Sequence, residues 1–254
     1  MTSKVVIVTG ASRGIGLAVA ESLLQQGNRV FLVARTAAPL QALKDKHPDQ
    51  VEFLVGDLTT KDVAHQVTVQ TMATYGQIDG VVINHGVITP IQRLTDADAS
   101  DWKKAFNANF FSALAVVRSS IPHLRVTMGR MVFVSSGAAE HAYQGWGAYC
   151  ITKAAVNGLV RQLQVEEPDI MSVAISPGRV DTDMQKVIRD KGRPGEIMTK
   201  EDYASFKSAY TEGSLIKPEV PAFVMAKVVT VGRKELSGGF FKWNAPEFSP
   251  YQDH

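Results

Sequence analysis

The strongest constraint on the fold is a series of six short β-branched runs, separated by segments long enough for helices. These runs are continuously apolar rather than alternating, which is typical of strands buried on both faces of a parallel sheet between crossover helices. They are residues 5–9, 30–34, 51–56, 81–84, 131–135 and 173–176, and a later run at 236–244 is the final strand. The sequence therefore predicts an α/β, doubly wound, seven-stranded parallel sheet with helices on both faces.

The length and composition suit one sizeable core. The chain has 254 residues, 45% of them hydrophobic, and no stretch has the composition of a linker. Basic residues number 27 against 25 acidic ones, so no nucleic acid or anionic membrane is expected as a main partner. We predict a single domain over residues 1–254, with no metal ion.

The cellular setting is predicted from what the sequence lacks. Cys150 is the single cysteine, which rules out an internal disulfide and suits a reducing compartment. No apolar run reaches membrane-spanning length, and the chain enters its first strand at once, without the flanks of a signal peptide. We expect a soluble cytoplasmic protein.

A glycine-rich turn follows the first apolar run and precedes an amphipathic segment at 17–26. It reads Thr-Gly-Ala-Ser-Arg-Gly-Ile-Gly, with glycines at 10, 14 and 16. Such a turn lets a pyrophosphate approach backbone N–H groups at the positive end of a helix. A cluster of this kind is sometimes only a turn. Its place in the opening β-α unit favours nucleotide binding.

The second run ends at Ala34-Arg35, where a dinucleotide fold reads the adenosine ribose. An acidic residue there would repel a 2′-phosphate, whereas Arg35 would bind one. Arg13, in the glycine turn, would contact the same phosphate from the other side. The alternative is a pair of exposed arginines on loops. The sequence favours NADP(H) over NAD(H).

Two further strand ends carry polar side chains. Asp57, followed by Leu58, would lie near the adenine edge and accept its amino hydrogen bond, or would instead be the N-cap of the next helix. Asn84 would lie near the second ribose of the cofactor, or would only satisfy backbone groups at the strand end.

The segment at 131–163 joins a strand, a loop and a helix. It contains Ser135-Ser136 and then Tyr149-Cys-Ile-Thr-Lys153, which places the phenol and the amine on one helix face. A nearby ammonium favours phenolate and would lower the tyrosine pKa from about 10, making the phenol a usable acid. A Tyr and a Lys at this spacing can also be a plain surface pair, and Tyr203-x-x-x-Lys207 is a second instance.

Taken together and in this order, these motifs resemble the short-chain dehydrogenase/reductase family, and the resemblance covers nearly the whole chain. In that family a serine lies thirteen residues before the catalytic tyrosine, which selects Ser136 over Ser135. Asp190 stands thirteen residues before Tyr203, so the second pair does not fit. The resemblance implies a Rossmann fold and an NADP-dependent oxidoreductase.

The resemblance also implies individual roles. Ser136 would bind the carbonyl oxygen and Tyr149 would deliver the proton, while Lys153 lowers the phenol pKa and binds the nicotinamide ribose. Asn109, with Asn107 as its structural neighbour, would connect Lys153 to solvent through a water held at a helix irregularity. The expected catalytic residues are Asn109, Ser136, Tyr149 and Lys153. The segment at 176–182 resembles the family motif that holds the nicotinamide carboxamide. The expected cofactor-binding residues are Gly10, Ser12, Arg13, Gly14, Ile15, Gly16, Arg35, Asp57, Leu58, Asn84, Tyr149, Lys153, Pro177, Gly178, Val180 and Thr182.

Two departures from the family pattern narrow the resemblance. His85 stands where the family commonly has alanine. It would be a hydrogen-bond donor in the second layer around the site, a substrate contact or merely a packed imidazole, and we favour the packed imidazole. The final strand lacks the Asp-Gly-Gly ending of many members. The ending that this chain has instead, together with the arginine pair, is more similar to the sepiapterin reductase and benzil reductase branch. This similarity implies a vicinal dicarbonyl substrate.

The segment at 183–217 is expected to fold over the substrate as a lid that excludes water. Candidate apolar walls of the substrate pocket are Tyr143, Trp146, Met184, Val187, Ile188 and Phe206, although any of them can be ordinary core. The predicted partner is a small-molecule carbonyl substrate. The resemblance implies a homodimer or homotetramer, formed through helices at 99–125 and 149–164. The alternative is a non-catalytic NADP(H)-sensing binding protein on the same scaffold.

Overall fold

Each of the six apolar runs forms a strand in the computed structural model, which describes residues 3–252. The strands are β1 Val5–Thr9, β2 Arg29–Ala34, β3 Val51–Val55, β4 Gly80–Ile83, β5 Arg130–Val134, β6 Met171–Ser176 and β7 Phe240–Lys242. Their bounds differ from the predicted ones by one or two residues, except that β7 is only the centre of the predicted run. The seven-stranded parallel sheet is confirmed.

The strand order in the sheet is β3-β2-β1-β4-β5-β6-β7, and every neighbouring pair is parallel. The chain therefore runs outward from β1 to one edge and returns to β4 on the other side of β1. Ligands of doubly wound sheets bind beyond the carboxyl ends of the strands, at such a reversal. The turns after β1 and β4 meet at this point.

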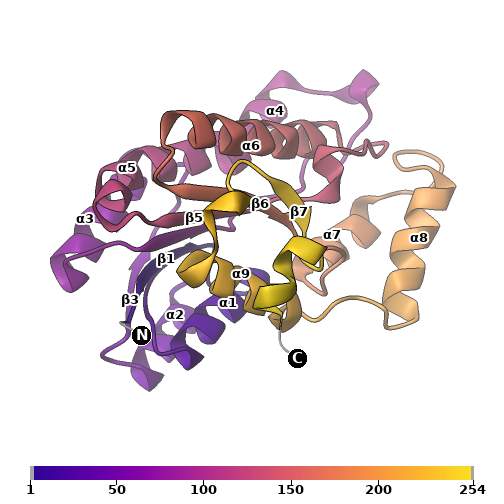
Figure 1. Cartoon of the computed structure of the whole chain (residues 1–254). Helices are drawn as coiled ribbons and strands as arrows, with labels where there is room; N and C mark the ends of the chain where they lie inside the picture. Colours follow the sequence, from indigo (N-terminus) through magenta and orange to yellow (C-terminus); the bar gives the residue numbers. More distant parts are fainter. Residues whose placement is uncertain (1–2, 253–254) are drawn as a thin grey trace.

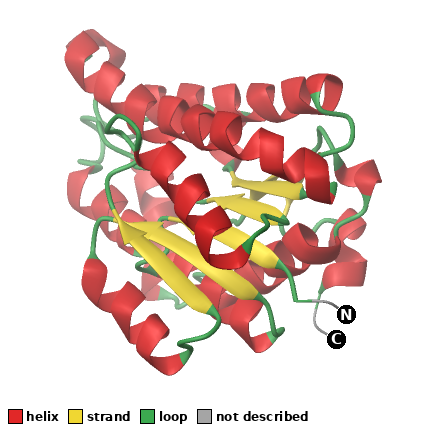
Figure 2. Ribbon diagram, turned by 90° about the vertical axis from the view of Figure 1, so that its left-hand side faces the viewer, coloured by secondary structure: helices red, strands yellow, loops and turns green. Residues whose placement is uncertain are grey.

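Helices cover both faces of the sheet, as Figures 1 and 2 show. Successive residues of a strand point to opposite faces, so Val6 and Val8 of β1 join one apolar cluster while Ile7 joins the other. The first cluster contains side chains of α1 Gly14–Gln25, α2 Ala37–Lys46 and α9 Glu219–Val231. The second contains side chains of α3 Val63–Tyr75, α5 Ser112–Thr127 and α6 Gly147–Glu166.

One long helical stretch is interrupted by a wider turn. It comprises α4 Ala99–Phe106, a π-helical turn at Asn107–Phe111 and then α5. The sequence resemblance led us to expect an irregularity here, and the π turn is that irregularity. Such turns occur often at functional sites, and this one carries Asn109 inward, where it is 2% exposed.

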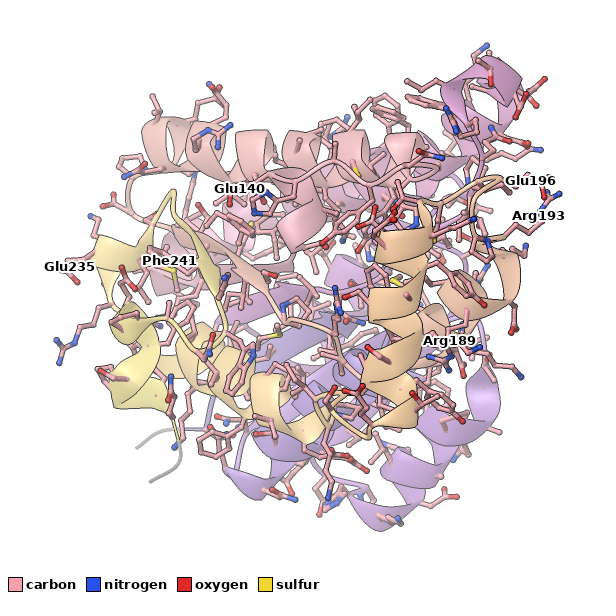
Figure 3. All side chains as sticks on the ribbon, turned by 90° about the vertical axis from the view of Figure 1, so that its right-hand side faces the viewer. Glu140, Arg189, Arg193, Glu196, Glu235 and Phe241 are labelled. Atoms are coloured by element: carbon pink, nitrogen blue, oxygen red, sulfur yellow. The ribbon has the colours of Figure 1, made fainter. Side chains whose placement is uncertain are left out.

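Two helices, α7 Asp183–Lys191 and α8 Lys200–Thr211, lie beyond the sheet, on the right of Figure 1. They pack on each other: the Arg189 guanidinium lies 3.9 Å from the centre of the Tyr210 ring, and the Tyr203 hydroxyl donates to the Arg189 carbonyl at 3.1 Å. Figure 3 labels Arg189 in this part of the molecule. Their inner side chains join a third apolar cluster with Trp146 and Tyr149. No helix within residues 3–252 is both long and apolar enough to cross a membrane.

Candidate active site

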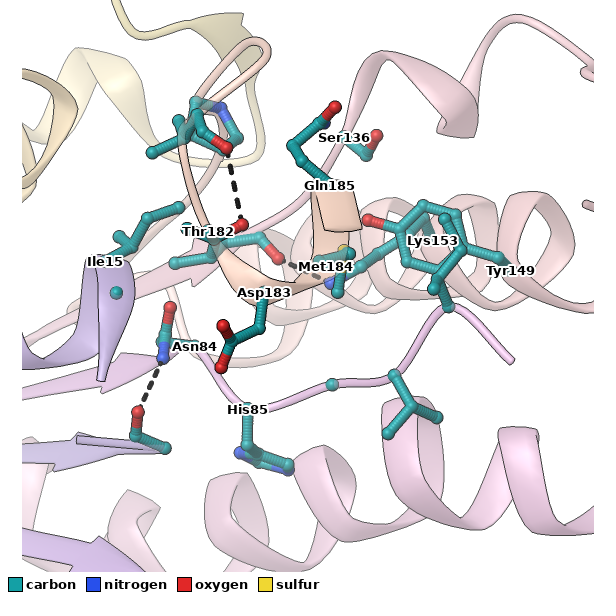
Figure 4. Close-up of a pocket in the computed structure, with 18 of the residues that line it drawn as sticks. Ile15, Asn84, His85, Ser136, Tyr149, Lys153, Thr182, Asp183, Met184 and Gln185 are labelled. Atoms are coloured by element: carbon teal, nitrogen blue, oxygen red, sulfur yellow. Dashed lines mark hydrogen bonds between the residues drawn. The ribbon is translucent and has the colours of Figure 1, made fainter. Parts of the chain in front are cut away.

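A large cleft opens at the carboxyl ends of the strands, with a volume of about 1380 Å³. Typical small-ligand pockets measure about 300–1,000 Å³, so this cleft has room for a dinucleotide together with a substrate. Its walls are the glycine turn after β1, the loops after β2 to β6, and α7. Figure 4 shows part of it.

The glycine turn brings backbone close to the cleft. Gly10 has a φ of +65°, and a Cβ at Gly16 would overlap the carbonyl oxygen of Gly10, so both positions require glycine. Helix α1 begins at Gly14 directly after the turn, and no side chain among residues 3–252 caps its first turn. Its first N–H groups are therefore available to an anion such as a pyrophosphate. The local geometry fits the predicted nucleotide-binding turn.

The two arginines of the predicted ribose site both line the cleft. Arg35 follows β2, with a side chain 67% exposed and 4.0 Å from the Asp57 carboxylate. Arg13 makes an ion pair of 2.9 Å with Asp183 at the start of α7. The structure thus brings both arginines to the same cleft, although Arg13 already has an acidic neighbour.

Asp57 has a local structural role that the sequence did not specify. Its Oδ1 accepts hydrogen bonds from the Thr59 backbone N–H at 2.9 Å and the Thr59 hydroxyl at 2.8 Å. The backbone bond is the main reason that the pKa of Asp57 lies below its usual value. Helix α3 begins at Val63, so the alternative that Asp57 is its N-cap is wrong. Asp57 and Leu58 both line the cleft.

Asn84 and His85 join β4 to the neighbouring elements. The Asn84 amide donates to the carbonyl oxygens of Thr9 and Gly10 at 3.0 and 3.2 Å, which fits the interpretation that it satisfies backbone at the strand end. The His85 ring nitrogens lie 2.7 Å from the Thr9 hydroxyl and 2.8 Å from the Ser112 hydroxyl. His85 is therefore a packed, bridging imidazole, as we favoured.

Ser136, Tyr149 and Lys153 come together on one wall of the cleft (Figure 4). Tyr149 and Lys153 lie one turn apart on α6, and the Lys153 Nζ is 5.7 Å from the centre of the Tyr149 ring. The Ser136 hydroxyl is close enough to the Tyr149 phenol to act on its pKa, and it accepts a hydrogen bond from the Ala138 N–H at 3.1 Å. The adjacent Ser135 instead donates its hydroxyl to Asn157 at 2.7 Å. Of the two serines, Ser136 is the one that acts on the Tyr149 phenol, and its catalytic role stays a prediction.

The expected lowering of the tyrosine pKa is not observed in this structure. Burial raises the pKa of Tyr149 to about 12, although the nearby Ser136 hydroxyl acts in the opposite direction. Burial also lowers the pKa of Lys153 to about 8. The two side chains are 6% and 5% exposed, and loss of water disfavours the charged form of each. The ammonium donates to the Val134 carbonyl at 2.7 Å rather than to the phenol.

Asn109 lies behind this group and holds the loop after β4. Its Oδ1 accepts from the Val87 N–H at 2.7 Å, while its Nδ2 donates to the Val87 carbonyl at 2.9 Å and to the Thr152 hydroxyl at 3.0 Å. The side chain thus has three partners and does not bond Lys153. Asn107 is exposed on the other side of the π turn.

The second Tyr-Lys pair lies in a different setting. Tyr203 uses its hydroxyl to bond the backbone of Arg189, and Lys207 is exposed on α8. Neither residue lines the cleft. The same spacing therefore has a packing role here.

A family model described as short chain dehydrogenase matches residues 4–193, well over half of the sequence. The chain belongs to the short-chain dehydrogenase family. It is therefore an oxidoreductase of a family that uses NAD(H) or NADP(H).

Relatives of this short-chain dehydrogenase span its full length. An uncharacterised oxidoreductase of Schizosaccharomyces pombe is 42% identical, over 95% of this chain and 97% of the relative. A Saccharomyces cerevisiae benzil reductase that forms (S)-benzoin is 36% identical, over 98% of this chain and 99% of the relative. The crystal structure of a Saccharomyces cerevisiae short-chain dehydrogenase/reductase has a TM-score of 0.95 at 37% identity, covering 99% of this chain and 100% of that chain. The resemblance to sepiapterin reductases stays a prediction.

The segment that follows β6 in this dehydrogenase also reaches the cleft. Pro177, Gly178, Val180 and Thr182 all line it, and so do the six candidate apolar walls: Tyr143, Trp146, Met184, Val187, Ile188 and Phe206. Gln185, which lies among these walls, was missed by the sequence reasoning. The available signal was its spacing of three from Ile188, since both side chains are buried on one face of α7.

Proposed function

We propose that the protein is an NADPH-dependent reductase that converts a small-molecule carbonyl, in particular a vicinal diketone, to an alcohol. The observation that carries this proposal is the meeting of Ser136, Tyr149 and Lys153 in the cleft that also contains the glycine turn. A hydroxyl, a phenol and an ammonium in one buried site are suited to binding a carbonyl oxygen and giving it a proton.

A preference for NADPH is supported by charge at the end of β2. No carboxylate side chain stands directly after the strand to repel a 2′-phosphate; Arg35 occupies that position with an exposed guanidinium. Arg13 lies across the same part of the cleft. Charge-assisted bonds from arginine to phosphate are among the stronger polar contacts in proteins.

In the proposed mechanism, a bound nicotinamide supplies hydride to the carbonyl carbon. Ser136 donates a hydrogen bond to the carbonyl oxygen as negative charge grows there, and Tyr149 passes its phenolic proton to that oxygen. Because burial keeps Tyr149 protonated, it is available as an acid at neutral pH. Lys153 carries its positive charge below a pKa of about 8, and would hold the ribose of the cofactor and favour the phenolate that remains.

The proposed substrate class is supported by the benzil reductase relative and by the lining of the cleft. The aromatic rings of Tyr143, Trp146 and Phe206 pack together, with ring centres 4.7 to 5.7 Å apart. Such walls suit a substrate with aromatic groups on either side of its carbonyls. We also propose that residues 183–217 act as the lid over this pocket, as part of a single domain.

The test is to incubate purified protein with NADPH and benzil and to follow the loss of NADPH absorbance. We expect turnover by the wild type, and a loss of about 10²–10⁴-fold in kcat for Tyr149→Phe, which cannot donate the proton. NADPH binding, measured by fluorescence titration, should persist in this variant.

The matched control is Tyr203→Phe, the same substitution in the second Tyr-Lys pair, which should retain most of the activity. Equal activity in wild type and Tyr149→Phe would remove Tyr149 as the acid. Tight NADPH binding with no turnover across a broad carbonyl panel would instead favour the non-catalytic, cofactor-sensing alternative.

A further inference from the structure

Buried polar atoms that lack a hydrogen-bond partner gather around the substrate half of the cleft. Six such side-chain atoms occur among the described residues, and three belong to residues that line the cleft: Trp146 Nε1, Gln185 Oε1 and Arg189 Nη1. Buried polar groups in native proteins are normally hydrogen-bonded. Three unpartnered atoms in the lining of one cleft therefore indicate that a bound molecule supplies partners there.

Gln185 is the most enclosed polar side chain of α7. It is 7% exposed and lies in the first turn of the helix, where its backbone N–H donates to the Thr182 carbonyl at 3.0 Å. Its neighbours Met184 and Ile188 are part of the apolar cluster that includes Tyr149. Figure 4 draws Gln185 in the same part of the cleft as Ser136 and Tyr149. An amide is therefore held between apolar neighbours in the wall of the cleft that Ser136 and Tyr149 also line.

The hydrogen-bonding groups of the Gln185 amide limit the kinds of partner that it can bind. A carboxamide has one acceptor and two donor hydrogens, and its oxygen and nitrogen can exchange places by rotation about the last bond. The buried unpartnered atom is the amide oxygen; Nε2 is not among these buried atoms and Gln185 lines the cleft, so the NH₂ group is the part of the amide that a molecule in the cleft can reach. Within residues 3–252 the Gln185 side chain has no hydrogen-bond partner. A ligand oxygen can therefore accept a hydrogen bond from its NH₂ group.

We propose that Gln185 determines specificity for vicinal dicarbonyls, by donating a hydrogen bond to the second carbonyl oxygen while Ser136 and Tyr149 hold the first. This inference rests on the proposed function and deepens it. A dicarbonyl presents two oxygens on adjacent carbons, and the cleft is lined by polar groups of two elements, α6 and α7. A monoketone leaves the Gln185 amide unpaired, and a site built for a hydrogen bond discriminates against a substrate that lacks the partner.

The experiment compares benzil with deoxybenzoin, which keeps both phenyl groups and lacks one carbonyl. The variant is Gln185→Met, which preserves length and removes the amide. The measured quantity is the ratio of kcat/KM for benzil to kcat/KM for deoxybenzoin, so the intrinsic reactivity of each ketone cancels between proteins. We expect this ratio to fall about tenfold or more, because Gln185→Met loses one buried hydrogen bond to benzil.

A second readout separates specificity from structure. Because the amide has no partner in the protein, Gln185→Met should unfold at the same urea concentration as the wild type or at a higher one. Lys191→Met, an exposed position on the same helix, is the control and should leave the ratio unchanged. Should Gln185→Met fail to fold, Gln185→Leu tests the same point, since it also removes the amide.

The outcomes distinguish the two levels of the proposal. Wild-type protein that reduces neither ketone with NADPH would remove the proposed function. Wild-type protein that reduces benzil, while Gln185→Met keeps the same ratio or loses stability and both activities together, would overturn the role of Gln185 alone.

Discussion

The imidazole of His85 is held in its neutral form by its surroundings. Burial is the main cause that lowers the pKa of His85 to about 4, and the nearby Lys153 adds to this effect. The unfolded chain has an ordinary histidine pKa of about 6.5 and so binds more protons than the native state between pH 6.5 and 4. Native stability due to this residue is present above pH 6.5 and is lost as the pH falls through that range.

A pH series of urea unfolding checks this consequence. From pH 7 to pH 5 we expect the wild type to lose about 2 kcal/mol of unfolding free energy that His85→Ala does not lose. The variant itself should be less stable at pH 7, since Thr9 and Ser112 lose their bridge. Identical pH profiles for both proteins would contradict the neutral, packed imidazole.

Cofactor choice is also decided by single side chains. Arg35→Ala removes the guanidinium proposed to bind the 2′-phosphate, so the Kd for NADPH should rise about tenfold or more while the Kd for NADH changes little. Fluorescence titration with both cofactors measures this. Arg29→Ala, at the opposite end of the same strand, is the matched control and should alter neither Kd. An equal loss of both cofactors would argue against 2′-phosphate recognition by Arg35.

At the scale of elements, the π turn between α4 and α5 is the feature that places a polar side chain behind the site. It turns Asn109 inward to bond both backbone groups of Val87, while Asn107 stays exposed. A helix without the extra residue would present a different face at this position. The loop after β4 thus depends on one side chain from another element.

Replacing that side chain tests the dependence. Asn109→Ala leaves the Val87 N–H and carbonyl without their partners, and we expect a loss of about 2–4 kcal/mol of unfolding free energy in urea. Asn107→Ala should cost less than about 0.5 kcal/mol, because surface substitutions are usually small. Equal effects of the two substitutions would show that the loop is held by other contacts.

At the scale of the whole molecule, the outer surfaces of α5 and α6 and the adjoining π turn carry exposed apolar side chains. Phe111 is 53% exposed, Leu114 37% and Ile151 47%. These helices belong to the segments for which we proposed subunit contacts, and apolar residues at such exposure are suited to an interface core.

Sedimentation velocity at micromolar concentration tests this proposal. We expect the wild type to sediment as a dimer or tetramer, and Leu114→Glu with Ile151→Glu to sediment as a monomer because the charges would be buried at the contact. Val69→Glu, at an exposed apolar position on α3, is the control and should not change the mass. A monomeric wild type would remove the proposed assembly.

Much of this architecture could be predicted from local patterns. The strands, the glycine turn after β1 and the Tyr149-Lys153 pair depend on periodicity and spacing along a few residues, which the order of amino acids determines directly. The choice of Ser136 over Ser135 also followed from spacing, through the family resemblance. These features are properties of neighbours in the chain.

Other features were decided only when distant segments packed together. The pKa of Tyr149 departed from expectation because burial, rather than its spacing from Lys153, is the main cause of its shift. His85 bridges Thr9 and Ser112, and Gln185 faces the cleft, through contacts between segments far apart in sequence. The sequence by itself determined which groups the protein contains and on which elements they lie; the tertiary structure decided which of them lose water and which partners they find, because solvation and long-range contact depend on the packed chain.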